Sequence, residues 1–128
     1  MEAERRKFTR FLVPENVYAA LGPSFSKVGR IKDVSIGGLA LEYITDEDSN
    51  LKTSYVDVFI RGEEFYLSKL PCKMVYDVPL ESSAGPPAFG LTHKRCGVQF
   101  YQFPNGLTKR LEGFLKGGTI GVTENHIP

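Results

Sequence analysis

Few cysteines and no long apolar run limit the kinds of protein that this sequence can encode. Its 128 residues include only Cys72 and Cys96, too few for a disulfide framework and not arranged as a Cys-x-x-Cys pair. We therefore expect two buried, reduced thiols. No apolar stretch approaches the length needed to span a bilayer, so we expect no membrane insertion.

A signal peptide and a strong net charge are also missing. The first four residues, Met1 to Glu4, are rich in acid and lack the apolar core of a secretory signal. We therefore expect a cytoplasmic protein. The net charge is only +1, whereas broad binding of DNA or RNA needs a larger basic field.

Metal and catalytic motifs are scarce. His93 and His126 are the two histidines, and with the cysteines they give no zinc-ligand spacing. Ser35, Asp33 and His93 could be read as a hydrolytic triad, but the sequence has no Gly-x-Ser-x-Gly nucleophile elbow. We therefore expect no metal, no cofactor and no enzymatic activity.

Short stretches of alternating apolar and polar residues are present along most of the chain, and they are typical of β-strands. Turn-forming residues such as Gly22-Pro23 and Gly37-Gly38 separate them. We regard Lys94-Arg95 as a solvated turn between two strand segments, more readily than as part of a basic ligand face. The expected strand segments are Asn16–Leu21, Phe25–Ser35, Leu39–Tyr43, Val56–Ile60, Phe65–Val78, Phe89–His93 and Cys96–Phe100.

The hydrophobic period changes near the end of the chain. Leu107, Leu111 and Phe114 fall at helical spacing after the candidate cap Asn105, and Gly117-Gly118 is a natural stop. Many short strands followed by one amphipathic helix predict a mostly β fold, a small antiparallel barrel with the helix packed on it. We expect one domain over 1–128, with a flexible basic arm at 1–11, a barrel at 15–101 and a helix at 105–117.

Two polar clusters carry the candidate chemistry. The first, Arg5-Arg6-Lys7-Phe8-Thr9-Arg10, is basic, and the second, Asp33-Val34-Ser35-Ile36-Gly37-Gly38, ends a strand. An arginine is a planar cation that can hold a phosphate, bond the edge of guanine or stack on a purine. A solvated tail and a serine turn are the plainer interpretations of the two clusters.

The second cluster suits a guanine base. In an extended strand Asp33 and Ser35 lie on the same face, because they are two residues apart. The carboxylate can accept hydrogen bonds from N1 and N2 of guanine, which adenine lacks, and the hydroxyl adds one further bond. Gly38 permits a backbone conformation or a close ligand approach that a side chain would block.

Taken together, Arg-x-x-x-Arg and, about two dozen residues later, Asp-x-Ser-x-x-Gly resemble the motifs of the PilZ domain, a bacterial receptor for cyclic di-GMP (c-di-GMP). The resemblance covers about residues 4–118. It implies a six-stranded PilZ-like β-barrel with a C-terminal helix, and Cys96-Gly97-Val98-Gln99-Phe100 resembles a structural strand of the family. By position, the ligand-binding residues would be Arg5, Arg6, Arg10, Asp33, Ser35 and Gly38.

The resemblance also implies a mode of action. Stand-alone members of the family pass a ligand-induced change to another protein, so we expect c-di-GMP and an unidentified downstream protein as partners. Arg5, just before the arginine pair, resembles members that bind an intercalated dimer of the dinucleotide. Two alternatives remain: a PilZ-fold protein-interaction module without nucleotide binding, and a small oligonucleotide-binding barrel, although we expect no DNA or RNA partner.

Overall fold

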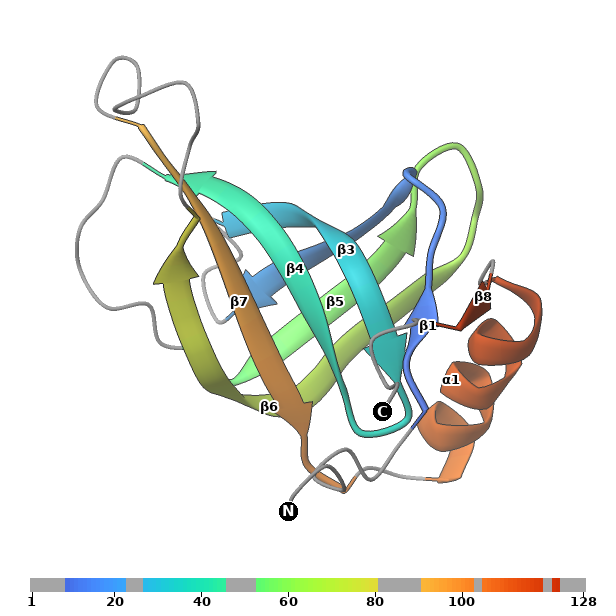
Figure 1. Ribbon diagram of the computed structural model, residues 1–128. Coiled ribbons are helices and arrows are strands. Elements are labelled where there is room, and N and C mark those ends of the chain that lie inside the picture. Colours follow the sequence, from blue (N-terminus) through green and yellow to red (C-terminus); the bar gives the residue numbers. More distant parts are fainter. Residues whose placement is uncertain are drawn as a thin grey trace.

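The computed structural model describes residues 9–22, 27–45, 53–80, 91–102, 105–118 and 121–122. Within them the chain forms strands and one helix, in an order of strands first and helix near the end (Figure 1). The elements are β1 (Phe11–Leu12), β2 (Val17–Gly22), β3 (Lys27–Ser35), β4 (Gly38–Thr45), β5 (Tyr55–Ile60), β6 (Tyr66–Pro79), β7 (Thr92–Phe100), α1 (Asn105–Gly117) and β8 (Gly121–Val122).

Six of these strands close into an antiparallel barrel. Neighbouring strands follow the order β2-β5-β6-β7-β4-β3, and a further pairing between β2 and β3 closes the ring. Closure satisfies the backbone groups that an open sheet would leave at its edges. The expectation of a mostly β barrel with a C-terminal helix is therefore confirmed.

Alternate side chains of the strands fill the barrel. Successive residues of a strand point to opposite faces, so every second residue enters the interior. Leu41, Leu67 and Leu70 are completely buried, and Val17 and Val56 join them. Burying one such side chain contributes about 1.5–3 kcal/mol, and the interior is the main source of stability.

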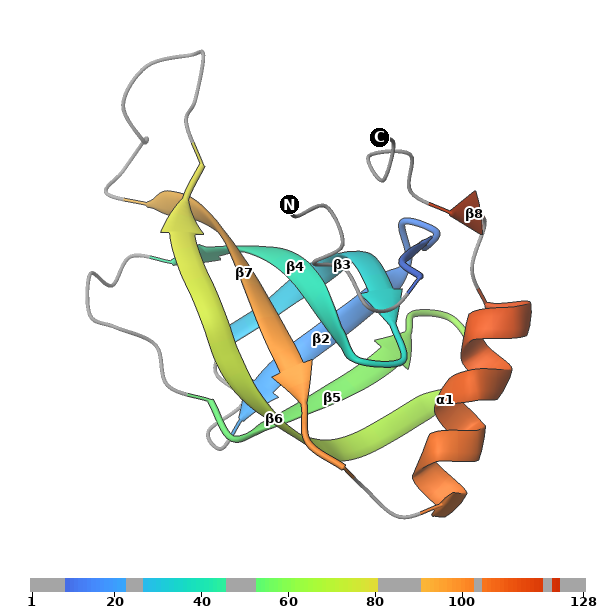
Figure 2. The same cartoon turned by 60° about the horizontal axis from the view of Figure 1, so that its bottom comes forward.

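Helix α1 lies beside one end of the barrel (Figures 1 and 2). Its apolar stripe supplies Leu111 and Phe114 to the core, and both side chains are buried. The ring of Phe114 stacks on the ring of Phe65, with centroids 5.1 Å apart. The stripe is therefore used in packing on the barrel. Among the described residues, no helix is long and apolar enough to cross a membrane.

Two very short strands extend the sheet beyond the ring. β1 pairs with the second half of β3, along the edge whose first half pairs with β2, and β8 then pairs with β1. The expected flexible arm at 1–11 therefore differs from the structure at Phe11, which is held in β1. Backbone hydrogen bonding to β3 fixes this position, which a count of charges in the sequence does not reveal.

Candidate functional site

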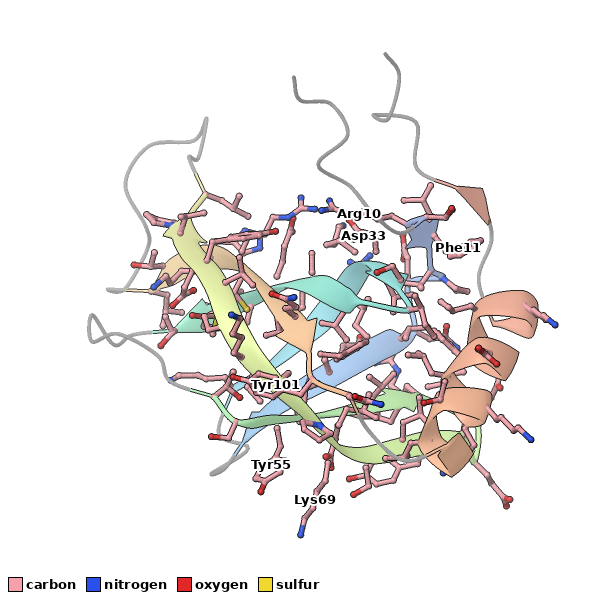
Figure 3. The ribbon with its side chains drawn as sticks, turned by 90° about the horizontal axis from the view of Figure 1, so that it is seen from below. Arg10, Phe11, Asp33, Tyr55, Lys69 and Tyr101 are labelled. Atoms are coloured by element: carbon pink, nitrogen blue, oxygen red, sulfur yellow. The ribbon has the colours of Figure 1, made fainter. Side chains whose placement is uncertain are left out.

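The end of the basic segment lies against the strand that carries the second motif. In the antiparallel pairing of β1 with β3, Phe11 faces Val34 and Leu12 faces Asp33. Arg10 precedes Phe11 and is partly exposed, so it lies at the Ser35 end of the pairing. Figure 3 shows Arg10 and Asp33 on the same side of the barrel. The structure therefore brings the second arginine of the pair next to the Asp-x-Ser motif.

The other predicted arginines, Arg5 and Arg6, lie outside the described residues. Their contribution to the site stays a prediction.

A β-bulge in β3 decides where the motif points. Ile31 pairs with Leu41 and Asp33 pairs with Ala40, so the intervening Lys32 is an extra residue in the ladder. Ile31 and Val34 both belong to the core although they are three residues apart. A regular strand would send Asp33 to the same face as Ile31, into the core. The bulge instead turns Asp33 and Ser35 away from the core, as bulges near functional sites often do.

Asp33 lies on the outer side of the barrel, but the residue as a whole is only 7% exposed. Nη2 of Arg95 lies 3.4 Å from its Oδ2, and Nη1 of the same arginine lies 3.6 Å from Oε2 of Glu42. A carboxylate with so little access to water is costly to bury unless a cation lies beside it. Asp33 is therefore a preformed anionic acceptor that a cation already neutralises.

The expectation of a solvated turn at Lys94-Arg95 is wrong. β7 runs through both residues from Thr92 to Phe100, and their side chains separate to opposite faces. Lys94 turns toward Asp77, with Nζ 3.0 Å from Oδ2, whereas Arg95 bridges Asp33 and Glu42. Arg95 belongs to this site, although the sequence predicted a turn at its position. The feature that could have identified it is its spacing from Gly97: two residues apart in a strand, the two lie on the same face.

Ser35 closes the turn between β3 and β4. Its Oγ accepts a hydrogen bond from the N–H of Gly37 at 3.0 Å and donates to the carbonyl of Gly38 at 3.4 Å. This is the serine turn that the sequence offered as the plainer interpretation. Of the oxygen's two lone pairs, one remains for another donor. The hydroxyl can therefore serve the turn and still accept one bond from a ligand.

Gly38 is required by the neighbouring strand. It pairs with Gln99 of β7, and a Cβ built on Gly38 would lie 2.2 Å from the carbonyl oxygen of Val98. No side chain fits at such a distance from backbone. The close approach comes from β7, so the fold alone explains the glycine, and its role in ligand clearance stays a prediction.

Small side chains separate the polar groups on the outer face. Across four strands the pairing gives the row Asp33, Ala40, Gly97 and Tyr76, which we call the small-residue row. The ring of Tyr76 covers Gly97, where an added Cβ would lie 2.3 Å from Cε2. A flat ligand can approach such a row closely, with a carboxylate at one end and an aromatic ring at the other.

The structure does not bring together the three residues of the possible hydrolytic triad, Ser35, Asp33 and His93. In the contacts of the described residues, His93 faces Glu42 at 3.5 Å, and the Ser35 hydroxyl bonds only to its own turn. The hydrogen-bond chain of a Ser-His-Asp triad is therefore not formed. Within the described part of the chain, no group of three or more His, Cys, Asp or Glu side chains is placed to hold a metal ion.

A family model described as the PilZ domain matches residues 4–117. This chain belongs to the PilZ domain family. The match covers both motifs and all of α1, so the family resemblance stated from the sequence is confirmed. A search of the curated proteins gave no significant match.

Several solved structures have the same fold. The PilZ domain of YcgR from Escherichia coli with c-di-GMP has a TM-score of 0.64 at 15% identity, covering 88% of this chain and 90% of that one. The MrkH–c-di-GMP complex of K. pneumonia has a TM-score of 0.66 at 17% identity, covering 88% and 52%. A longer YcgR chain of E. coli in complex with c-di-GMP gives 0.61 at 13%, covering 88% and 45%. This PilZ chain spans about half the length of the longer YcgR and MrkH chains.

Proposed function

We propose that this protein is a bacterial receptor for c-di-GMP that acts in the cytoplasm and passes a ligand-induced change to a partner protein. The observation that carries the proposal is the pairing of Phe11 with Val34, which puts Arg10 beside the Asp-x-Ser motif of a PilZ domain. YcgR and MrkH, which have this fold, were solved with c-di-GMP, and this supports the same ligand here.

Each motif residue has a role that suits its chemistry. Arg5, Arg6 and Arg10 hold the phosphates and the edges or faces of the guanines, because a guanidinium can do either. The Asp33 carboxylate accepts hydrogen bonds from N1 and N2 of guanine, and the Ser35 hydroxyl accepts one further hydrogen bond from the ligand. Gly38 keeps β4 and β7 close, so that the turn stays low beneath the ligand.

Ligand binding can change the surface that a partner meets. Arg5 and Arg6 precede β1 in sequence, so closing them over a ligand on β3 would cover part of the barrel with a new segment. The ligand then favours one arrangement by its differential contacts, and the partner reads that arrangement. No catalytic step is needed for this function.

The experiment is a calorimetric titration of the protein with c-di-GMP, with cyclic di-AMP (c-di-AMP) as the control. We expect saturable binding of c-di-GMP and at least tenfold weaker binding of c-di-AMP, whose adenines lack the hydrogens that Asp33 accepts. The stoichiometry separates one dinucleotide per chain from an intercalated pair. An absence of binding would favour the alternative of a protein-interaction module on the same fold.

A further inference from the structure

Arg95 connects two carboxylates on the outer face of the barrel. Its Nη2 lies 3.4 Å from Asp33 and its Nη1 lies 3.6 Å from Glu42. The Arg95 side chain is 34% exposed, whereas those of Asp33 and Glu42 are 11% and 20% exposed. The cation is therefore the most accessible of the three groups, and both of its anionic partners lie at the candidate site.

The reach of Arg95 follows from the strand register. Arg95 faces Glu42 directly across β4 and β7, but Asp33 lies on β3, beyond β4, where it faces Ala40. The arginine therefore extends diagonally over the small-residue row. A guanidinium presents separate N–H groups to the two acids, which the single ammonium of a lysine does not.

Binding of guanine would change the partners of Arg95. When the Asp33 carboxylate accepts hydrogen bonds from the neutral edge of a guanine, its ion pair with Arg95 is weakened. The ligand that displaces this contact also carries two phosphate anions. An exchange that gives Asp33 a guanine edge and Arg95 a phosphate leaves each charged group with a partner, and unpaired charges in poorly hydrated sites are costly.

We propose that Arg95 is a further ligand-binding residue of this PilZ domain, one that releases Asp33 and takes a phosphate oxygen of the dinucleotide. The inference deepens the proposed function and depends on it. It adds β7 to a site otherwise built from the basic segment, from β3 and from the start of β4. Glu42 is a positioning residue, because it holds the guanidinium over the small-residue row in the unliganded protein.

The test is titration with c-di-GMP of wild type, Arg95→Ala and Arg95→Lys, with Arg61→Ala as the matched control. Arg61 follows β5, which lies on the opposite side of the closed barrel from β4, and its guanidinium stacks over Tyr18 at 5.7 Å. We expect Arg95→Ala to weaken binding by roughly ten- to a hundredfold, the range for a lost charged hydrogen bond. Arg95→Lys should fall between, and Arg61→Ala should bind like wild type.

The salt dependence of affinity separates phosphate contact from a purely structural role. A lost phosphate contact reduces the slope of log affinity against log salt, because salt screens the attraction between a guanidinium and a phosphate. Arg95→Ala should show this reduction, whereas Arg61→Ala, with the same loss of net charge, should not. Weaker binding of Arg95→Ala with an unchanged slope would overturn the inference, since Arg95 would then only position Asp33.

Two further outcomes are distinguishable. If wild type and Arg95→Ala bind c-di-GMP equally, or the variant binds more tightly, the inference fails and the receptor function stands. If the wild type itself does not bind, the proposed function fails and the inference with it. Thermal unfolding of each variant verifies that the barrel is intact, and Arg95→Lys retains a charge at the site should Arg95→Ala prove unstable.

Discussion

Phe11 of β1 lies opposite Val34 of β3. This one pairing sets the position of Arg10 relative to Asp33 and Ser35, which lie on either side of Val34 in the strand. Without it, the two motifs would be separate features of the sequence. With it, a cation at the end of the basic segment and a carboxylate beyond a β-bulge lie on one side of the barrel (Figure 3).

Asp33 provides a test of base selectivity. We expect Asp33→Asn to weaken c-di-GMP binding by roughly ten- to a hundredfold, because a charged acceptor is lost. The preference for c-di-GMP over c-di-AMP should narrow as well, since an amide can donate to adenine where a carboxylate cannot. Calorimetric titration of both dinucleotides measures the two effects.

Asp57→Asn is the matched control for that variant. Asp57 is also 7% exposed, but it bonds to the hydroxyl of Tyr66 and the N–H of Lys69 on the far side of the barrel. The Asp57→Asn variant should be less stable than the wild type but should keep the preference for c-di-GMP over c-di-AMP. If Asp33→Asn retained the wild-type preference for c-di-GMP, Asp33 would not read guanine.

The two glycines of the site should differ in how strictly they are required. A Cβ at Gly38 meets the backbone of Val98, whereas a Cβ at Gly97 meets the ring of Tyr76, which can rotate away. Overpacking of this kind lowers the free energy of unfolding by about 1–3 kcal/mol. We expect the loss for Gly38→Ala to be at or above the upper end of this range, and the loss for Gly97→Ala to be at its lower end. Urea unfolding measures both.

A second substitution makes that comparison more stringent. Tyr76→Ala should restore most of the stability lost in Gly97→Ala, because it removes the clashing ring. It should give no recovery in Gly38→Ala. Equal losses for the two glycine variants, with no rescue by Tyr76→Ala, would contradict the packing described here.

A polar network inside the barrel should contribute to stability without affecting the ligand. Asp77 accepts from the hydroxyl of Tyr43 at 2.7 Å and pairs with Lys94 at 3.0 Å, and both side chains of the ion pair are at most 15% exposed. Burial, together with the bond to Asp77, raises the pKa of Tyr43 far above its ordinary value. We expect Asp77→Ala to lower the free energy of unfolding by roughly 2–4 kcal/mol, because the charge of Lys94 is left without its partner. The loss should be smaller than for a fully buried pair, since these two side chains are partly exposed.

The double variant Asp77→Ala/Lys94→Met is the comparison for this network. It should cost less than Asp77→Ala alone, since no unpaired charge remains. Chemical unfolding gives the free energies. A double variant that loses the sum of the two single effects would show that the pair is not coupled.

The buried thiols of Cys72 and Cys96 should make the protein less stable at alkaline pH. Burial raises the pKa of Cys72 to about 11 and the pKa of Cys96 to about 12, against about 8.5 for a free thiol. Below pH 8 both states keep these protons, so the full stability is present. As the pH rises from about 8.5 toward 12, the unfolded chain loses its thiol protons first, and the free energy of unfolding falls.

Urea unfolding between pH 7.5 and 10.5 measures this dependence, with Cys72→Ala/Cys96→Ala as the reference. The variant is less stable at neutral pH because it lacks two buried side chains, but its stability should fall less steeply above pH 8.5. Identical slopes for the variant and the wild type would contradict the assignment.

The sequence was sufficient where structure follows from local pattern. The alternation around Leu39, Leu41 and Tyr43 marks β4, and the helical spacing of Leu107, Leu111 and Phe114 marks α1. These periods indicate which face each element buries, and a barrel covered by one helix follows from them. The Asp-x-Ser-x-x-Gly motif could be found for the same reason, because it is contiguous.

Features that depend on strand partners were not predictable. The extra residue at Lys32 becomes a bulge only through the register of β4, and Arg95 meets Asp33 from 62 positions away in the chain. Lys94-Arg95 looked like a turn because two adjacent charges suggest full solvation. In a strand, however, the side chains of neighbouring residues point to opposite faces. Lys94 therefore pairs with Asp77 on one face, and Arg95 pairs with Asp33 on the other.

The central claim is that c-di-GMP is held between the basic segment and the end of β3, and Arg10→Ala tests it most directly. Calorimetric titration should show at least a tenfold loss of c-di-GMP affinity, because a charged hydrogen bond and any stacking are removed together. The thermal unfolding midpoint should stay within a few degrees of the wild type, since partly exposed Arg10 lies outside the core. If Arg10→Ala binds the dinucleotide as tightly as the wild type, the site proposed here is wrong.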